Sequence, residues 1–506
     1  MFPARLALRQ GGPFAHPNVF DPTGLTMKIR SIASAAALVC LAAPAFALTP
    51  AQIDGSTVQL WIAGASAPTA GVAGAIAKLC ADEDGVAGPD DLHVYLEKTP
   101  TNAADAFAGK SNAGKFAAYA CTMGAAAGSL AGVKTVVYHT FDVGSFEAYT
   151  PHLKLAGEVN PSVPATVKRL KDIKTTAACV AHPTVPNTYT GCGTDTVTVA
   201  PNASVYSLPT LPVGGISDTE YTLNQLNLGV SKSLGDIGSE VSTNVGQGFG
   251  VAVSYPLYVA MQVAQGLTAG GACAATGSGA AISAVNATPA CQPNISKQKY
   301  ASLVGANVVD KNASLLGASG NLTVERRVGT SGTQSASNAF FLNKPCGTGL
   351  VGGELALEGS NLIGSTVYPG GVTIRSNNGS TDVKNNLTAA SNAGTNAIGV
   401  LSLENAASTT EKFAYLKVNG VSPTTDNMHR ATAVAGDYEF WYEMVAFTAT
   451  SAPTEGADLM TGLTTVLADP SVTNLRGLFV TPLSGFTGSS VSAGYKAGNA
   501  CAPAVQ

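Results

Sequence analysis

The feature that most constrains the fold is a repeated succession of an apolar strand, a short turn of small residues and a helix. The first example starts with a β-favouring run at residues 57–63, turns through Gly64-Ala65-Ser66-Ala67-Pro68 and enters an Ala-rich helical stretch. A second such run begins at Val133, the segment Val213–Asp218 follows a Pro-flanked strand, and a fourth apolar strand extends over Gly250–Leu257. Strands that alternate with helices in this way indicate an α/β fold with at least partly parallel sheets.

Other parts of the chain refine this picture. Residues 265–300 are rich in Gly, Ala, Ser and Asn, which is typical of an insertion or a long surface loop. No repeat stands out along the chain, which argues against a solenoid or a propeller. Trp61, Tyr255, Trp441 and Tyr442 each lie in an apolar β run, so we expect them in the strand core rather than in a ligand-stacking set.

The N-terminal region contains a secretory signal that starts at an internal methionine. Met27-Lys28-Ile29-Arg30 supplies a basic start, residues 32–43 an apolar run, and Ala45-Phe46-Ala47 a small-residue cleavage site. The apolar run is too short to cross a bilayer, which needs about 20 residues. We expect residues 1–26 to be an extension from an upstream start site and residues 27–47 to be a signal peptide cleaved after Ala47. The protein is then periplasmic or secreted, with no membrane span after cleavage.

Cysteine usage fits an oxidising compartment. Removal of the signal peptide takes away Cys40 and leaves an even number of cysteines, which predicts disulfides in an exported protein. Many connectivities are open, but pairing of neighbours would join Cys80 with Cys121, Cys179 with Cys192, Cys273 with Cys291, and Cys346 with Cys501. Zinc is the alternative, yet no C-x-x-C or H-E-x-x-H motif occurs and the His residues are scattered. We therefore expect no metal and no cofactor.

Composition and charge exclude two classes of protein. The hydrophobic fraction is 45% and the charged fraction only 12%, which excludes a disordered polyelectrolyte. The whole chain carries 28 Lys and Arg against 32 Asp and Glu. Without residues 1–47, 24 basic and 31 acidic residues remain, a net charge of −7. Since no Lys/Arg cluster could neutralise a phosphate backbone, nucleic acid is not an expected partner.

The most informative local sequence runs from Glu325 to Leu342. A strand delivers Arg326 and Arg327, a loop of small residues follows, and Ser331-Gly332-Thr333 stands where a helix should begin. A helix start offers free backbone N–H groups and a positive partial charge, and an Arg can bind two oxygens at once. This arrangement could hold an oxyanion, with plain helix capping as the alternative. Arg326 points the opposite way along an extended strand, so we interpret it as a solvated or structural charge.

Several further segments complete a pattern when they are taken in chain order. They are Gly64-Ala65-Ser66-Ala67-Pro68, Gly144-Ser145, Gly215-Ile216-Ser217-Asp218, Arg327-x-x-x-Ser331-Gly332-Thr333, Asn396-Ala397-Ile398-Gly399-Val400 and Val421-Ser422-Pro423-Thr424-x-x-Asn427. In this order the chain resembles the periplasmic phosphate-binding protein of phosphate ABC importers. The resemblance lies in separate segments between residue 57 and about residue 447. The resemblance implies a two-lobed periplasmic-binding-protein fold of type II, with mixed sheets flanked by helices and a ligand cleft between the lobes.

The resemblance also implies which residues bind the ligand. They are Ser66, Ala67, Ser145, Asp218, Arg327, Ser331, Gly332 and Thr333. The first three would donate hydrogen bonds from turns of one lobe, and the last four would close the site from the other lobe. The carboxylate of Asp218 would accept a proton from hydrogenphosphate and repel sulfate, although a turn-stabilising role for this residue is the alternative.

Lobe boundaries follow from the strands expected to cross between lobes. Lobe one is expected at residues 48–249 and 400–506 and lobe two at residues 250–399, with crossovers near Gly250–Ser254 and Ile398–Leu401. A disulfide between Cys346 and Cys501 would then join different lobes, so either that pairing or the boundary must differ.

The leading functional hypothesis is an exported solute-binding protein that captures an inorganic oxyanion, with phosphate as the first candidate and an ABC importer as a partner. The alternative is a secreted or surface protein that retains the binding-protein fold and serves in adhesion, matrix or assembly without transport. A phosphate-ester hydrolase ranks third, because no G-x-S-x-G elbow, P-loop or metal cluster appears in the sequence. We therefore expect that the protein is not an enzyme.

Overall fold

A computed structural model describes the greater part of the chain. The described residues are 48–82, 92–100, 113–174, 179–305, 312–347, 365–368, 370–482, 491–492, 494–496 and 499–505. All of them belong to one compact unit. The expected signal peptide lies outside the described residues, so it stays a prediction. Within the described part of the chain, no helix is long and apolar enough to cross a membrane.

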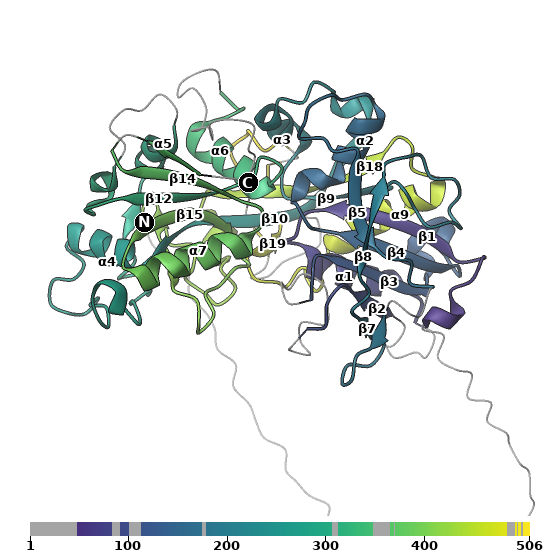
Figure 1. Cartoon of the computed structure of the whole chain (residues 1–506), viewed down its shortest axis with the longest axis horizontal. Coiled ribbons are helices and arrows are strands. Elements are labelled where there is room, and N and C mark those ends of the chain that lie inside the picture. The colour runs from purple at the N-terminus through teal and green to yellow at the C-terminus, as the bar shows by residue number, and fades with distance from the viewer. Residues whose placement is uncertain are drawn as a thin grey trace, which may run out of the picture. The chain divides into compact units, whose positions relative to one another are not determined.

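Strands and helices alternate along most of the described chain (Figure 1). The helices are α1 (Thr69–Leu79), α2 (Thr150–Leu155), α3 (Tyr221–Leu228), α4 (Tyr255–Ala264), α5 (Lys297–Val304), α6 (Gly332–Leu342), α7 (Ser380–Ala393), α8 (Ala431–Val434) and α9 (Thr454–Leu467). The strands up to the centre of the chain are β1 (Val58–Gly64), β2 (His93–Leu96), β3 (Phe116–Thr122), β4 (Lys134–Thr140), β5 (Thr166–Leu170), β6 (Val180–Ala181), β7 (Thr188–Thr190), β8 (Thr194–Thr198), β9 (Gly214–Ser217) and β10 (Gly238–Ser254). The later strands are β11 (Asn294–Ile295), β12 (Leu322–Arg327), β13 (Ser365–Tyr368), β14 (Val372–Asn377), β15 (Asn396–Ser402), β16 (Phe413–Tyr415), β17 (Lys417–Val418), β18 (Trp441–Ala449) and β19 (Leu478–Val480).

One large mixed sheet organises the described residues. Its strand order is β13-β14-β12-β15-β10-β18-β9-β1-β4-β3-β2-β7-β6, and β16 and β19 also pair with β10. The long strand β10 pairs with β18 through its first part and with β15 through its last part. We call the strands from β18 to β6 the first half-sheet and those from β13 to β15 the second half-sheet. The predicted α/β class with a mixed sheet flanked by helices is confirmed.

The two half-sheets carry separate hydrophobic cores. Helices α1 and α9 cover the first half-sheet, and their apolar side chains join those of β1, β3 and β4 in one buried cluster. Helices α4 to α7 belong to the cluster of the second half-sheet, where α7 lies against β15 (Figure 1). This second cluster continues beyond residue 400 to Trp441 and Tyr442, and it includes Ala500. Cys346 also packs against it, so the tail and Cys346 share one core. The predicted lobe boundaries themselves stay a prediction.

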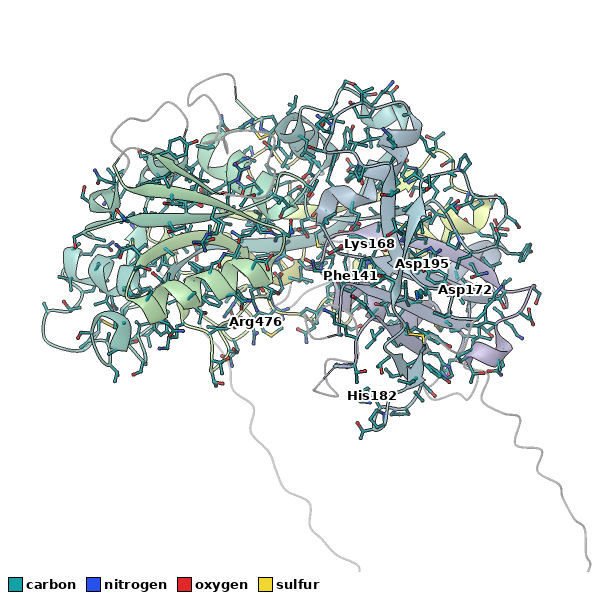
Figure 2. The ribbon with its side chains drawn as sticks, in the orientation of Figure 1. Phe141, Lys168, Asp172, His182, Asp195 and Arg476 are labelled. Atoms are coloured by element: carbon teal, nitrogen blue, oxygen red, sulfur yellow. A yellow bond between two sulfur atoms is a disulfide. The ribbon has the colours of Figure 1, made fainter. Side chains whose placement is uncertain are left out.

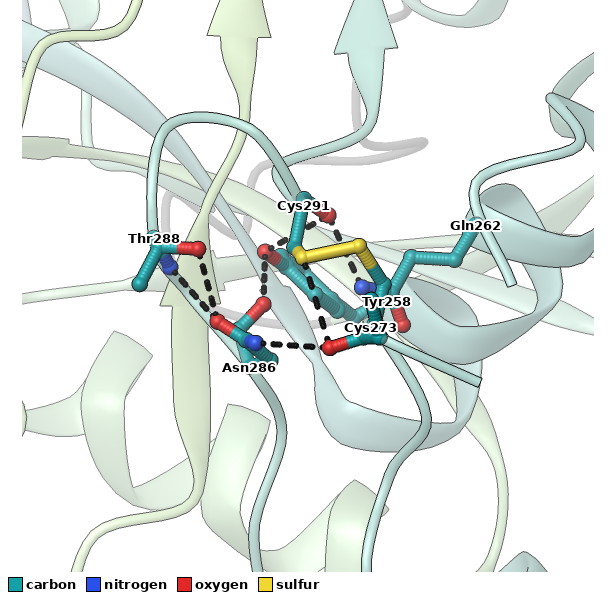
Figure 3. The surroundings of a disulfide bond; sticks show 7 residues. Tyr258, Gln262, Cys273, Asn286, Thr288 and Cys291 are labelled. Carbon is teal, nitrogen blue, oxygen red and sulfur yellow. Dashed lines mark hydrogen bonds between the residues drawn. A yellow bond between two sulfur atoms is a disulfide. The ribbon is translucent and has the colours of Figure 1, made fainter. Parts of the chain in front are cut away.

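Four disulfides join the same neighbouring cysteines that the sequence suggested. They are Cys80–Cys121, Cys179–Cys192, Cys273–Cys291 and Cys346–Cys501. The third lies in the predicted Gly/Ala-rich loop, which consists mostly of turns between α4 and α5. Figure 3 shows that the amide of Asn286 donates to the carbonyl of Ala272, and that the amide of Gln262 donates to the carbonyl of Cys291 at 2.8 Å. The bond from Gln262 fastens the loop to α4, and the bond from Asn286 joins two parts of the loop.

One aromatic residue is not where the sequence suggested. Trp61, Trp441 and Tyr442 are buried strand residues, as predicted. Tyr255 is instead the first residue of α4 and is only half-buried. Pro256 follows it, and proline is favoured in the first turn of a helix because it has no N–H to lose and its φ already suits the helix. The prediction that the strand continues to Leu257 is therefore wrong.

Candidate functional site

The predicted turns of the first half-sheet lie at one edge of it. Strand β1 is parallel to β4, where Ala63 faces Thr140, and parallel to β9, where Gly64 faces Ile216. The carboxyl ends of parallel strands meet at the same edge, which is where α/β sheets usually bind ligands. Ser66, Ser145 and Asp218 therefore all follow strands that end at this edge.

The second half-sheet brings a similar edge to the site. Strand β12 is parallel to β14 and β15, and its last residue is Arg327, which faces Asn377 of β14. The helices that follow these strands are α6 after β12 and α7 after β14. As the sequence predicted, α6 begins at Gly332. Ser331 precedes it, and its side chain caps no backbone N–H of the helix. Plain helix capping therefore does not explain this serine.

Ser145, Asp218 and Gly332 come together from three segments that are far apart in the sequence. Ser145 opens the short 3-10 helix η5 (Ser145–Ala148), and its hydroxyl oxygen accepts a hydrogen bond of 3.3 Å from the backbone N–H of Asp218. Gly332 lies directly against both residues. A Cβ atom at position 332 would stand 2.4 Å from Ser145 Oγ and 2.8 Å from Asp218 Cβ. Only glycine allows α6 to begin this close to the first half-sheet.

Two hydrogen bonds fix the loops on either side of this contact. The backbone N–H of Phe146 donates to the carbonyl of Thr330 at 3.0 Å, and the Thr330 hydroxyl donates to the carbonyl of Val143 at 3.0 Å. Between them, Gly144 has a φ of 108° and approaches Ser331, so that a Cβ there would lie 3.0 Å from Ser331 Cα. The two half-sheets are thus in direct contact through the turns that the sequence singled out.

The carboxyl group of Asp218 is buried and incompletely bonded. The side chain is 5% exposed, and its Oδ1 atom has no hydrogen-bond partner in the protein. Burial raises the pKa of Asp218 to about 7, and the negative charge of Glu404 acts in the same direction. The Ser145 hydroxyl and Arg327 oppose this shift in pKa. A buried acceptor without a partner is uncommon and calls for a ligand or an ordered water.

Arg327 is buried to a similar degree, with 4% of its surface exposed. Its Nη1 atom donates to the Ser380 hydroxyl at 3.0 Å and its Nη2 atom donates to the carbonyl of Asn378 at 2.8 Å. The Nε atom has no partner in the protein. Burial lowers the pKa of Arg327 to about 10, although Asp218, Asp382 and Glu404 act against this. Arg327 therefore remains a cation at neutral pH and keeps an unused donor.

The remaining predicted residues differ in their surroundings. Ser331 and Thr333 are buried beside the contact, at the start of α6. Ser66 is exposed and Ala67 is half-buried, in the turn between β1 and α1. Among the described residues, no hydrogen bond joins Ser66 to Ser145, Asp218 or Arg327. The structure thus gathers Ser145, Asp218, Ser331, Gly332 and Thr333 around one contact, places Arg327 where its charge acts on Asp218, and leaves the first turn open to solvent.

Three residues near the site were not found from the sequence. Asn378 and Ser380 hold the guanidinium of Arg327, and Glu404 acts on the charges of both Arg327 and Asp218. The segment Ser376-Asn377-Asn378-Gly379-Ser380 repeats the pattern of strand, small-residue turn and helix start, so this pattern was a usable signal. Glu404 follows β15 without any motif.

A groove of about 390 Å³ opens on the outer side of the same loops. Val143, Thr330 and Asn378 line one wall of it, and Thr166 and Lys168 of β5 line another. Figure 2 shows Lys168 together with Asp195 of β8, the strand that pairs with β5. Thr330 and Val143, which are joined by a hydrogen bond, line this groove, whereas Ser145 and Asp218 do not.

Neither metal-ligating residues nor relatives in sequence add information about this site. Within the described residues, no group of three or more His, Cys, Asp or Glu side chains could hold a metal ion. No protein-family model matches the chain, and no curated protein is similar to it in sequence.

Matches of the chain to solved structures are of low similarity, and two of them illustrate this. One is a candidate phosphate ABC transporter substrate-binding protein with bound phosphate from Clostridium perfringens, with 13% identity and a TM-score of 0.29 over 53% of this chain and 84% of that one. Another is a candidate phosphate binding protein from Planctomyces limnophilus, with 9% identity and a TM-score of 0.31 over 83% of this chain and 90% of that one. With TM-scores this low, the two structures do not place the chain in a family.

Proposed function

We propose that this chain is an exported solute-binding protein that captures an inorganic oxyanion, with phosphate as the first candidate. The observation that carries the proposal is a pair of buried polar atoms without partners, Asp218 Oδ1 and Arg327 Nε, in two residues whose charges act on each other. Asp218 also lies at the contact between Ser145 and Gly332. A buried open acceptor and a buried open charged donor are what a small, partly protonated anion would satisfy.

Each group has a defined part in holding such an anion. Arg327 Nε and the Ser145 hydroxyl donate hydrogen bonds, and the backbone N–H groups of Gly332 and Thr333 add donors because the first N–H groups of a helix have no partner within it. The positive partial charge at the start of α6 also favours an anion there. The carboxylate of Asp218 accepts a hydrogen bond from a protonated oxygen of the anion. No step in this proposal changes a covalent bond, so the protein binds its ligand without acting on it as an enzyme.

The carboxylate gives the proposed site its selectivity. An ionised Asp218 repels an anion without protons, such as sulfate, and accepts a hydrogen bond from hydrogenphosphate. Sulfate would leave Asp218 Oδ1 without a hydrogen bond, and a buried acceptor without a partner is unfavourable. We therefore expect sulfate to bind with lower affinity than phosphate. Arsenate carries protons like phosphate, so we expect it to compete.

Uptake would depend on relative movement of the two half-sheets. The donors on η5 belong to the first half-sheet and those on α6 to the second, so the anion would bridge them and stabilise the closed arrangement. We infer the two half-sheets with their helices as the moving parts. The lobes predicted above, residues 48–249 with 400–506 and residues 250–399, would then be redrawn so that part of the chain beyond residue 400 moves with the second half-sheet, to which the Cys346–Cys501 disulfide and the second hydrophobic cluster join it. An ABC importer that receives the ligand and a periplasmic or secreted location complete this proposal.

Isothermal titration calorimetry on residues 48–506 tests the proposal, with phosphate, arsenate and sulfate as ligands. We expect binding of phosphate and arsenate, much weaker binding of sulfate, and loss of binding in Arg327→Ala. Arg326→Ala is the matched control, because the neighbouring arginine is only half-buried and lies on the opposite face of β12. Absence of heat with all three anions, or equal losses in both arginine variants, would overturn the proposal.

A further inference from the structure

The guanidinium of Arg327 is held by the turn between β14 and α7. Strand β14 runs parallel to β12 with Asn377 opposite Arg327, so the chain that follows β14 passes the end of the Arg327 side chain. That chain turns through Asn378 and Gly379 and enters α7 at Ser380. Both terminal nitrogens of the guanidinium donate to this turn, at 3.0 Å to the Ser380 hydroxyl and at 2.8 Å to the Asn378 carbonyl.

We propose that the turn at Asn378–Ser380 is a neutral clamp that positions Arg327 for the anion and sets how strongly the site attracts it. The inference deepens the proposed function and rests on it. Guanidinium nitrogens lie in one plane and in a fixed fork, so two bonds on one side of the group fix the direction of the Nε–H bond. The unpartnered Nε atom is then oriented by Ser380 and Asn378, not by the ligand.

The clamp is uncharged, and this determines its effect on affinity. Among the described residues, no carboxylate lies within 4.0 Å of the Arg327 guanidinium nitrogens. Asp218, Asp382 and Glu404 act on Arg327 from three different elements, and Asp382 accepts a bond from the backbone N–H of Gly379. A hydroxyl and a carbonyl orient the guanidinium without cancelling its charge, so the positive charge stays available to the anion.

Substitutions of Ser380 separate positioning from simple structural support. Ser380→Ala removes one partner of Arg327, and we expect phosphate affinity to fall by about tenfold, as for loss of one hydrogen bond to a charged group. Ser380→Thr retains the hydroxyl and should restore affinity. Ser380→Asp places a carboxylate against the guanidinium and an acidic residue in the first turn of α7, where it stabilises the helix. We expect this variant to unfold at the same or a higher temperature than the wild type, yet to bind phosphate still more weakly than Ser380→Ala.

Calorimetry with inorganic phosphate and thermal unfolding without ligand give the two readouts. Equal affinity of wild type, Ser380→Ala and Ser380→Asp would overturn the clamp, and so would parallel losses of affinity and unfolding temperature in Ser380→Asp. A double-mutant cycle on unfolding, with Arg327→Met and Ser380→Ala, tests the contact without any ligand. If the wild type binds no anion, the proposed function fails. In that case, coupling in the cycle supports the contact between Arg327 and Ser380, whereas absence of coupling overturns the clamp together with the proposed function.

Discussion

Replacement of Asp218 by asparagine tests the electrostatics of the site directly. In the folded protein the pKa of this carboxyl group is raised from 3.8 to about 7, mainly by burial. Below pH 3.8 the group is protonated in both the folded and the unfolded state and makes no difference to stability. Between pH 3.8 and 7 the unfolded state ionises while the folded state keeps its proton, so the free energy of unfolding falls by about 1.4 kcal/mol per pH unit. Above pH 7 this loss is complete.

The size of the effect follows from the two pKa values. Their difference corresponds to about 4 kcal/mol of unfolding free energy, which we take as an upper value because buried carboxylates relax and recruit water. Asparagine has a similar shape and does not ionise. We therefore expect Asp218→Asn to match the wild type near pH 4, to exceed its stability increasingly up to about pH 7, and to keep that difference up to pH 8, while phosphate binding is weakened.

Urea unfolding followed by circular dichroism measures the difference in unfolding free energy between Asp218→Asn and the wild type from pH 4 to pH 8, in buffers free of phosphate and sulfate. Asp236→Asn is the control, because hydrogen bonds from Ser233 lower the pKa of the exposed Asp236 below its ordinary 3.8, so its substitution should change stability by a constant amount between pH 4 and pH 8. If wild type and Asp218→Asn have the same dependence on pH over this range, Asp218 ionises normally and the reasoning about a buried, unpaired carboxyl group is refuted.

Three further outcomes are expected. Gly332→Ala puts a methyl group against Ser145 and should destabilise the folded state by about 1–3 kcal/mol while abolishing phosphate binding in calorimetry; a variant that binds like the wild type would contradict the close contact. In wild type, sulfate should bind better as the pH falls below 7, because protonated Asp218 no longer repels it, and a flat profile from pH 5 to 8 would contradict this role. The double variant Cys346→Ser with Cys501→Ser should lose about 2–5 kcal/mol of stability in urea, and an unchanged midpoint would show that the tail is held by its other contacts.

Local patterns in the sequence predicted the local structure well. The start of α6 at Gly332 and the turn before Ser145 follow from apolar runs that end in small residues, because such runs have few alternatives to a strand that turns into a helix. Tyr255 was misplaced because an apolar run of this length fits a strand or a helix equally well. The proline after it was the available signal.

The sequence predicted the candidate site only in part. The meeting of Ser145, Asp218 and Gly332 depends on the register of strands that lie more than seventy residues apart in the sequence, and no local propensity encodes that register. Resemblance to a family named these residues, whereas the pattern of residue types alone left helix capping and turn formation open. Ser380 carries the same local signal as Ser331 but lay outside the resemblance, so it was overlooked.

The shared strand β10 has a consequence for how the chain can fold. Its first part completes the first half-sheet only by pairing with β18 and β19, which lie near the end of the sequence, whereas β15 and β16 reach its last part much earlier. During synthesis the second half-sheet can therefore assemble while its neighbour still exposes an unpaired edge. Such late, long-range closure is slow and leaves a nascent chain open to aggregation. The neighbours of β1 are already present once β9 is made, but β9 and the first part of β10 find β18 only when the chain extends to Ala449.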